Sequence, residues 1–328
     1  MFGWRRVERR AAPPAEAAAA QAAGRSAPDG SASTQAGRAD ALLRRLEWTV
    51  IRRLDGLLQG DYRTLFRGFG LDFADLREYL PGDDVRYMDW NVTARLQVPQ
   101  VREFQEDREI AAWFLLDLSG SVDFGSGEVR KRALSSDFTA VMGRLLTGHG
   151  NRVGGMLYNG VADAPPAVLP ARSGRRHLLH MLDRLHGTAA APRGETRLRA
   201  LLDHARGVLK RRSLLFVVSD FISEPGWEAP LGMLSRHHEV IAVRLSDPLE
   251  MALPDAGLVV LEDAETGDQL LVDTHDAGFR ERFSAAAAAR EAALAQAFAR
   301  CGVDCLALTT AQRLDLALLD FARRRKRR

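Results

Sequence analysis

Three short oxygen-bearing side chains follow the longest apolar run of the chain at alternate positions. The run Ile110–Leu116 is followed by Asp117, Ser119 and Ser121, with Gly120 between the two serines. A run of this length is too short to span a membrane and fits a strand that is buried on both faces. Such a strand delivers its carboxyl end to the crevice where open α/β sheets bind ligands. Carboxylate and hydroxyl oxygens brought together by a glycine turn suit the oxygen shell of Mg²⁺.

Two distant segments carry side chains of the same kind. The apolar run Leu214–Val218 ends in Ser219 and Asp220, and Thr196 stands in a loop before a helical pattern. The plainer interpretation is that Asp, Ser and Gly simply end strands, and that the threonine caps the helix. The alternative is one oxygen-only site for a divalent cation, which is Mg²⁺, Mn²⁺ or Ca²⁺. The candidate metal ligands are Asp117, Ser119, Ser121, Thr196 and Asp220.

The segment Asp117–Ser121, which reads D-L-S-G-S, resembles the metal-ion-dependent adhesion site of von Willebrand factor A domains. In that site, D-x-S-x-S is followed by a threonine and then by a strand-end aspartate, and here Thr196 and Asp220 match in order. The resemblance extends from Ile110 to the C-terminus. It implies that the two serines and the threonine bind the cation directly, and that the aspartates bind directly or through water. A cation with few anionic ligands would then accept a carboxylate from another protein.

A second resemblance lies upstream, in a segment dense in charged and aromatic residues. The sequence from Gly70 to Arg95 is similar to the signature of the bacterial family called domain of unknown function fifty-eight. That family typically has a von Willebrand A-like module encoded near a MoxR-type AAA+ ATPase, which implies an adaptor or co-chaperone partner of such an ATPase. The segment fits either a cap braced by arginine–carboxylate pairs or a recognition surface. The candidate partner-binding residues are Arg77, Tyr79, Asp83, Asp84, Arg86, Asp89, Trp90 and Arg95.

Two other functions stay open. One is a Mg²⁺-dependent hydrolase that uses Asp117, although phosphoaspartyl chemistry needs a second carboxylate two residues on, where this chain has Ser119. The other is a structural scaffold with a vestigial metal site. The sequence contains neither the G-x-S-x-G elbow of serine hydrolases nor a P-loop. We therefore predict a binding module rather than an enzyme.

The composition of the 328 residues, 46% hydrophobic and 27% charged, is ordinary for a globular protein. No apolar run approaches the roughly 18 residues of a membrane helix, and no secretory signal is evident. We predict a cytoplasmic protein without a membrane span. The net charge of +3 is concentrated at the chain ends, which argues against specific nucleic-acid binding. Weak contact with an anionic surface stays open for the basic tail, residues 323–328.

Composition, apolar periodicity and the two resemblances divide the chain into four parts. Residues 1–38, rich in Ala, Pro and Gly, are expected to form a disordered tail, and residues 39–108 to contain a helix from Asp40 to about Gly60 followed by the signature segment. Residues 109–322 are expected to form the von Willebrand A-like domain, and residues 323–328 the basic tail. Alternating strands and helices predict an α/β fold with a mostly parallel sheet. The resemblance implies a doubly wound sheet of the von Willebrand A or Rossmann-like kind, with the Ile110 strand central. Strands are predicted at 110–116, 152–158, 167–169, 214–218, 240–245, 257–261, 269–272 and 303–308, and helices at 128–148, 174–185, 196–210, 230–236, 277–300 and from 311.

Overall fold

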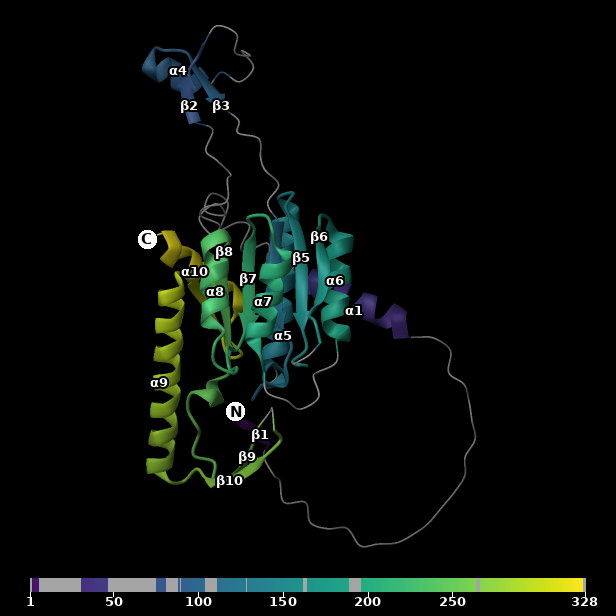
Figure 1. Ribbon diagram of the computed structural model, residues 1–328, viewed down its shortest axis with the longest axis vertical. Coiled ribbons are helices and arrows are strands. Elements are labelled where there is room, and N and C mark those ends of the chain that lie inside the picture. Colours follow the sequence, from purple (N-terminus) through teal and green to yellow (C-terminus); the bar gives the residue numbers. More distant parts are fainter. Residues whose placement is uncertain are drawn as a thin grey trace, which may run out of the picture.

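The computed structural model describes ten stretches of the chain. They are residues 2–5, 31–46, 75–80, 88, 90–103, 111–127, 129–161, 164–188, 196–263 and 266–326. Figure 1 shows a central sheet with helices on both faces and a small second sheet at one end. In the described part of the chain, no helix is long and apolar enough to cross a membrane.

The central sheet has six strands in the order β11-β8-β7-β4-β5-β6. Five are parallel, and β6 pairs antiparallel with β5 at one edge. The strands are β4 (Ala111–Asp117), β5 (Arg152–Tyr158), β6 (Ala167–Arg172), β7 (Leu214–Ser219), β8 (Glu239–Ser246) and β11 (Asp304–Thr309). Because β4 lies inside the sheet and is covered on both faces, its sequence is an unbroken apolar run. The predicted α/β class, mostly parallel sheet and central β4 are confirmed.

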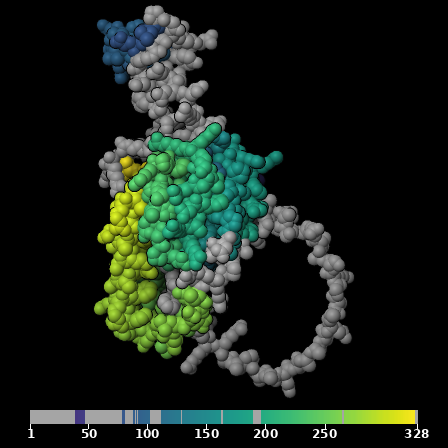
Figure 2. Space-filling view, viewed as in Figure 1, coloured from purple at the N-terminus to yellow at the C-terminus, as the bar shows by residue number. Residues whose placement is uncertain are grey.

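Helices cover both faces of this sheet. One face carries α1 (Ser31–Leu46), α5 (Lys131–Gly148), α6 (Arg175–Gly187) and α10 (Leu314–Lys326). The other carries α7 (Leu198–Val208), α8 (Glu228–His237) and α9 (Ala277–Cys301). Side chains of β4 alternate between these two cores, so Phe114 stacks on Phe216 at 5.1 Å on the first face while Trp113 packs on the second. Figure 2 shows α9, in yellow-green to yellow, running along the body of the molecule.

Gly154 of β5 allows one close contact within the sheet. A Cβ atom at this position would lie 2.8 Å from Cε3 of Trp113, closer than side chains tolerate. The residue is therefore glycine because the neighbouring indole occupies the space that a side chain would fill.

A small sheet lies at the end of the molecule where the parallel strands finish (Figure 1). It pairs β1 (Phe2–Arg5) and β10 (Gln269–Asp273) antiparallel with the middle strand β9 (Leu258–Asp263). The strands predicted at 257–261 and 269–272 are confirmed and form a hairpin, and Gly267 in its turn has φ +77°, a conformation that glycine adopts without strain. The sheet has its own apolar cluster around Val259, Leu261 and Val272.

Two predictions about the chain ends are wrong for the described residues. Residues 1–38 were expected to be disordered, but Phe2–Arg5 form β1 and the first helix already begins at Ser31. Residues 323–328 were expected to form a separate basic tail, but α10 continues to Lys326, and Arg325 forms ion pairs with Glu239 and Asp304. In each case a distant segment supplies the partner. The predicted extension of the first helix to about Gly60 lies outside the described residues.

Within the signature segment, the structure describes a small unit. It consists of β2 (Asp75–Glu78), α4 (Trp90–Leu96) and β3 (Gln100–Glu103), with β2 and β3 paired antiparallel. The Thr93 hydroxyl accepts a hydrogen bond from the Gln100 N–H at 2.9 Å, which joins the helix to β3. Figure 1 shows this unit apart from the main sheet.

Candidate functional site

The strand β4 ends in a carboxylate that is fully buried at the carboxyl edge of the central sheet. Oδ1 of Asp117 accepts the Ser119 N–H at 3.0 Å, and Oδ2 accepts the Ser219 hydroxyl at 2.7 Å. Burial, reinforced by the nearby Asp220 carboxylate, raises the pKa of Asp117 to about 6 against the effect of these hydrogen bonds. This edge therefore holds negative charge that the protein only partly compensates.

The turn after β4 brings two hydroxyl groups together. Ser119 and Ser121 are buried, and their Oγ atoms lie 3.2 Å apart. The chain turns here into the short 3₁₀ helix η3 (Gly120–Asp123), and the Val122 N–H donates to the Ser119 carbonyl at 3.1 Å. Neighbouring oxygens in an octahedral Mg²⁺ shell with bonds of about 2.1 Å are roughly 3 Å apart. The spacing of the two hydroxyls therefore suits one shared cation.

The end of β7 lies beside the end of β4. Leu116 pairs with Val218 in parallel register, so the next residues, Asp117 and Ser219, are neighbours on the same face. The following residue, Asp220, is also fully buried, and its Oδ1 accepts the N–H of residue 222 at 3.1 Å. Phe221 has φ +52°, which is uncommon for a residue with a side chain. This bend returns its N–H to the Ser219 hydroxyl at 2.9 Å.

A buried lysine, absent from the predicted site, contacts one of the predicted ligands. Lys131 begins α5, and its Nζ donates to Asp220 Oδ2 at 2.8 Å and to Glu250 Oε1 at 2.6 Å. Burial disfavours the ammonium, but the two carboxylates outweigh it and raise the pKa of Lys131. Burial likewise opposes ionisation of Asp220, but Lys131, with a smaller effect of Arg244, lowers the pKa of that carboxyl.

The loop after β8 braces this ion pair. Glu250 closes the 3₁₀ helix η4 (Pro248–Glu250), and its Oε2 accepts the Asp247 N–H at 3.1 Å. The Asp247 carboxylate accepts the Ser126 N–H at 3.0 Å and the Thr310 hydroxyl at 2.6 Å. Burial works against the charge of Asp247, yet the hydrogen bonds, chiefly those from Ser126, lower its pKa. The loops after β4, β8 and β11 are thus tied to one another.

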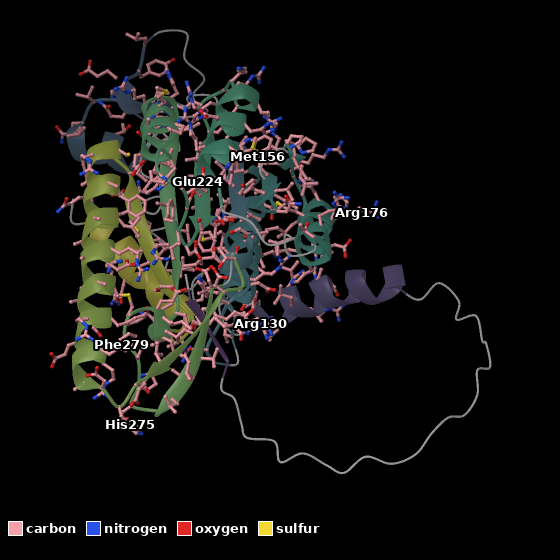
Figure 3. The ribbon with its side chains drawn as sticks, turned by 60° about the horizontal axis from the view of Figure 1, so that its bottom comes forward. Arg130, Met156, Arg176, Glu224, His275 and Phe279 are labelled. Carbon is pink, nitrogen blue, oxygen red and sulfur yellow. The ribbon has the colours of Figure 1, made fainter. Side chains whose placement is uncertain are left out.

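Thr196 lies buried at the same edge, just before α7. Its carbonyl accepts the Glu224 N–H at 3.0 Å and the Ser223 hydroxyl at 2.8 Å, so it packs on the loop that follows β7. The N–H of the next residue, Arg197, donates to the Tyr158 hydroxyl at the end of β5. Figure 3 turns this end of the molecule forward and labels Glu224 of that loop and Arg130, the residue before Lys131.

The structure therefore brings all five predicted ligands to one edge of the sheet. Hydrogen bonds join Asp117 to Ser119 and Ser119 to Ser121 directly. Asp220 and Thr196 reach the edge through the loop after β7. That all five oxygens meet around one ion stays a prediction.

The donor set of this edge fits a divalent cation. The buried carboxylates of Asp220 and Glu250 share the single Lys131 ammonium, and the buried Asp117 carboxylate accepts only an N–H and a hydroxyl, so this edge keeps surplus negative charge. Among the residues that the structure describes, no group of three or more His, Cys, Asp or Glu side chains could hold a metal ion. A cation at this edge would therefore depend on the serine and threonine hydroxyls for part of its coordination.

The candidate partner-binding residues belong to the signature segment. Asp83, Asp84, Arg86 and Asp89 lie outside the described residues. Arg77 is part of β2, and the Tyr79 N–H donates to the Pro99 carbonyl at 2.9 Å. Trp90 and Arg95 are exposed on α4, with 67% of Trp90 accessible. A role for these residues in partner binding stays a prediction.

The match to a family model covers most of the signature segment and of the α/β domain. A family model described as "Protein of unknown function DUF58" matches residues 75–293. The chain belongs to the DUF58 family. This DUF58 protein is 39% identical over 288 residues to the uncharacterized proteins Rv1480 of Mycobacterium tuberculosis and Mb1516 of Mycobacterium bovis. Each alignment covers 88% of this chain and 90% of the relative.

Solved structures similar to the DUF58 protein include two from Bacteroides. One is the conserved hypothetical protein BatB of Bacteroides thetaiotaomicron, with a TM-score of 0.43. The other is an aerotolerance-related membrane protein of Bacteroides fragilis, with a TM-score of 0.42. Both are 14% identical, and each match covers 67% of this chain and 100% of the other. Likenesses of this degree do not bear on function.

Proposed function

We propose that this DUF58 protein is a metal-dependent protein-binding module. It holds one divalent cation, Mg²⁺ or else Mn²⁺ or Ca²⁺, at the carboxyl edge of the sheet and offers that cation to a carboxylate of a partner protein. The observation that carries the proposal is the pair of buried hydroxyls of Ser119 and Ser121, 3.2 Å apart beside the buried Asp117 carboxylate.

We propose different tasks for the five ligands, and the hydrogen bonds of the two aspartates support this division. Both oxygens of Asp117 and both oxygens of Asp220 already accept hydrogen bonds within the protein. The hydroxyls of Ser119, Ser121 and Thr196 would therefore bind the cation directly, while the carboxylates supply negative charge and act directly or through water. A bound cation supplies a Lewis-acidic position for one further oxygen ligand. Lys131 favours the binding of such a further ligand, because its positive charge offsets part of the negative charge around the cation.

Burial of the five ligands has a consequence for partner binding. Each of these residues is at most 1% exposed. A carboxylate of another protein reaches the cation only if the surrounding loops move, so binding is coupled to a rearrangement of this edge. The turn that begins at Gly120 is the part of the site with partial exposure, which makes it the point of entry.

Apolar side chains are exposed at the same end of the molecule, on the small sheet. Leu258 and Leu271 are 70% and 64% exposed, and Leu270 beside them is 47% exposed. Exposed leucines grouped on one hairpin are typical of a surface that another protein covers. Together with the cation they provide the apolar part of a protein interface.

The partner that we propose is a MoxR-type AAA+ ATPase, the class that the resemblance of the signature segment implies. Exposed Trp90 in the signature segment would give a second contact. A hydrolase is less well supported, because Asp117 is buried and hydrogen-bonded through both oxygens. A fixed carboxylate of this kind suits a binding site better than an attacking nucleophile.

A pull-down with the MoxR-type ATPase encoded beside this protein tests the proposal. We expect capture in Mg²⁺ that is lost in EDTA and lost in the double variant Ser119→Ala/Ser121→Ala. Ser173→Ala, at an exposed serine away from this edge, is the matched control and should bind as the wild type does. Undiminished capture by Asp117→Ala would contradict the metal bridge.

A further inference from the structure

A basic cavity opens at the opposite end of the sheet, where β7 and β8 begin. Its volume is about 680 Å³, and it lies between the C-terminal ends of α7 and α8, which Figure 1 shows on the same face of the sheet. Cationic and imidazole side chains line most of it: Arg206, Lys210, Arg212, Arg236, His237 and His238.

The positive charge of this cavity is only partly neutralised within the described residues. Lys210, Arg212 and Arg236 form no salt bridge with any residue that the structure describes. The neighbouring acids are already engaged, because Asp203 pairs with two arginines of α7 and Glu239 pairs with an arginine of α10. The cavity therefore keeps a surplus of positive charge.

A buried imidazole faces the same cavity. His238 is 8% exposed, and its Nδ1 has no hydrogen-bond partner among the described residues. Its backbone N–H, by contrast, donates to the Leu234 carbonyl at 2.8 Å and ends α8. An unpartnered buried polar atom lowers stability, so its retention beside a cavity points to a ligand that completes the hydrogen bond.

Helix ends explain only part of this arrangement. Basic residues in the last turn of a helix interact favourably with its negative end, which accounts for Arg206 on α7 and Arg236 on α8. Lys210 and Arg212 lie beyond the end of α7, in the connection to β7, and that explanation does not extend to them. It does not account for the side chain of His238 either.

We propose that this cavity binds a multiply charged phosphate anion. Guanidinium groups present paired N–H donors that match phosphate oxygens, and the imidazole adds a buried donor. Three unpaired cations match a di- or triphosphate group better than a single carboxylate. Met233, 44% exposed at the same cavity, offers an apolar contact to whatever carries the phosphates. The site is independent of the metal centre at the other end of the sheet.

Calorimetric titration of the full chain with tripolyphosphate tests the proposal, in EDTA so that the metal centre plays no part. We expect one binding site. Arg212→Ala/Arg236→Ala should weaken the affinity at least about tenfold, because it removes two charge-assisted contacts. Arg282→Ala, at an exposed arginine of α9, is the matched control and should leave the affinity unchanged. His238→Leu should weaken binding without lowering the thermal unfolding midpoint.

Two further arms identify the source of the phosphate. Vesicles that contain phosphatidylinositol bisphosphate should bind in competition with tripolyphosphate if the ligand is a lipid headgroup. A failure of vesicles to bind, with tripolyphosphate still bound, assigns the cavity to a free phosphate compound. The proposal is overturned if tripolyphosphate gives no binding, if the double arginine variant binds it equally well, or if polyglutamate binds as tightly.

Discussion

The two ends of the central sheet treat charge in opposite ways. At the carboxyl edge, Asp117, Lys131 and Asp220 are fully buried, and each is hydrogen-bonded within the protein. At the amino edge, Lys210 and Arg212 are exposed and form no salt bridge within the described residues. Buried charges are costly unless they are paired with good geometry, so the first end is constrained by the folded chain itself. Exposed charges of one sign act on molecules outside the chain.

The same strands connect these ends. β7 and β8 begin beside the basic cavity and end beside Asp220 and Asp247, about 20 Å away for strands of this length. Substitutions at the carboxyl edge should therefore change the stability of the fold, whereas those at the amino edge should change binding alone.

Replacing the buried ammonium should have the largest effect. Lys131→Met leaves Asp220 and Glu250 buried without their counter-charge, so we expect the free energy of unfolding to fall by about 3 to 5 kcal/mol. Urea denaturation measures this change. Arg199→Met breaks an exposed pair with Asp203 and should cost at most about 1 kcal/mol. Equal effects of the two substitutions would show that the buried ion pair contributes no more to stability than an exposed one.

The ionisation of Asp117 should make the free energy of unfolding depend on pH. Its pKa is about 6 in the folded state against 3.8 as the ordinary value, so the folded state binds more protons between these pH values. The stability that this group contributes is present below about pH 4 and is lost as the pH rises through 6. Between pH 4 and pH 7, the free energy of unfolding of the wild type should fall by on the order of 2 kcal/mol more than that of Asp117→Asn. Denaturation at several pH values measures the difference, and Mg²⁺ should reduce it.

Removing one hydroxyl beside that carboxylate should cost less. Ser219→Ala deletes the 2.7 Å hydrogen bond to Asp117 and the acceptor of the Phe221 N–H, for an expected loss of about 1 to 2 kcal/mol. Chemical denaturation of the variant beside Ser173→Ala, an exposed serine, provides the measurement. If Ser219→Ala and Ser173→Ala lowered the free energy of unfolding equally, the buried hydrogen bonds of Ser219 would not stabilise the fold.

The amino edge should give the smallest change in stability. Arg212→Ala/Arg236→Ala removes two exposed charges that have no salt-bridge partner among the described residues, so the free energy of unfolding should change by no more than about 0.5 kcal/mol. Thermal unfolding measures it. A loss as large as that of Lys131→Met would show that the basic cavity is structural.

The local pattern of apolar and polar residues was sufficient to predict most of the central sheet and its helices. The limits of β5 agree with the predicted strand at 152–158, and the long helix α9 was predicted within one residue at its end. The strand-end positions of Asp117 and Asp220 also followed from the sequence, because parallel strands that end in polar residues finish at the same edge. Ser219 was recognisable in principle, since side chains alternate along a strand and place it beside Asp117 once the register is known.

Features that depend on distant partners were not predictable in this way. Nothing in Phe2–Arg5 indicates that it pairs with β9, more than 250 residues later. The partner of Lys131 at Glu250 lies 119 residues away. The sequence contained a weak indication that Lys131 has a special role, because the chain has three lysines among its 46 lysine and arginine residues. A lysine in so arginine-rich a chain is consistent with a position that needs a compact ammonium rather than a planar guanidinium.

The central claim is that the carboxyl edge binds one divalent cation through its serine hydroxyls. Calorimetric titration of Mg²⁺ into the metal-free full-length protein tests it most directly, with Ser119→Ala/Ser121→Ala as the variant and Ser173→Ala as the control. We predict one site per chain in wild type and control, no binding by the double variant, and about 2.7 kcal/mol of added stability at a hundredfold excess over Kd. No heat of binding, together with an unfolding midpoint that is the same in Mg²⁺ and in EDTA, would contradict the account and leave a scaffold without a working metal site.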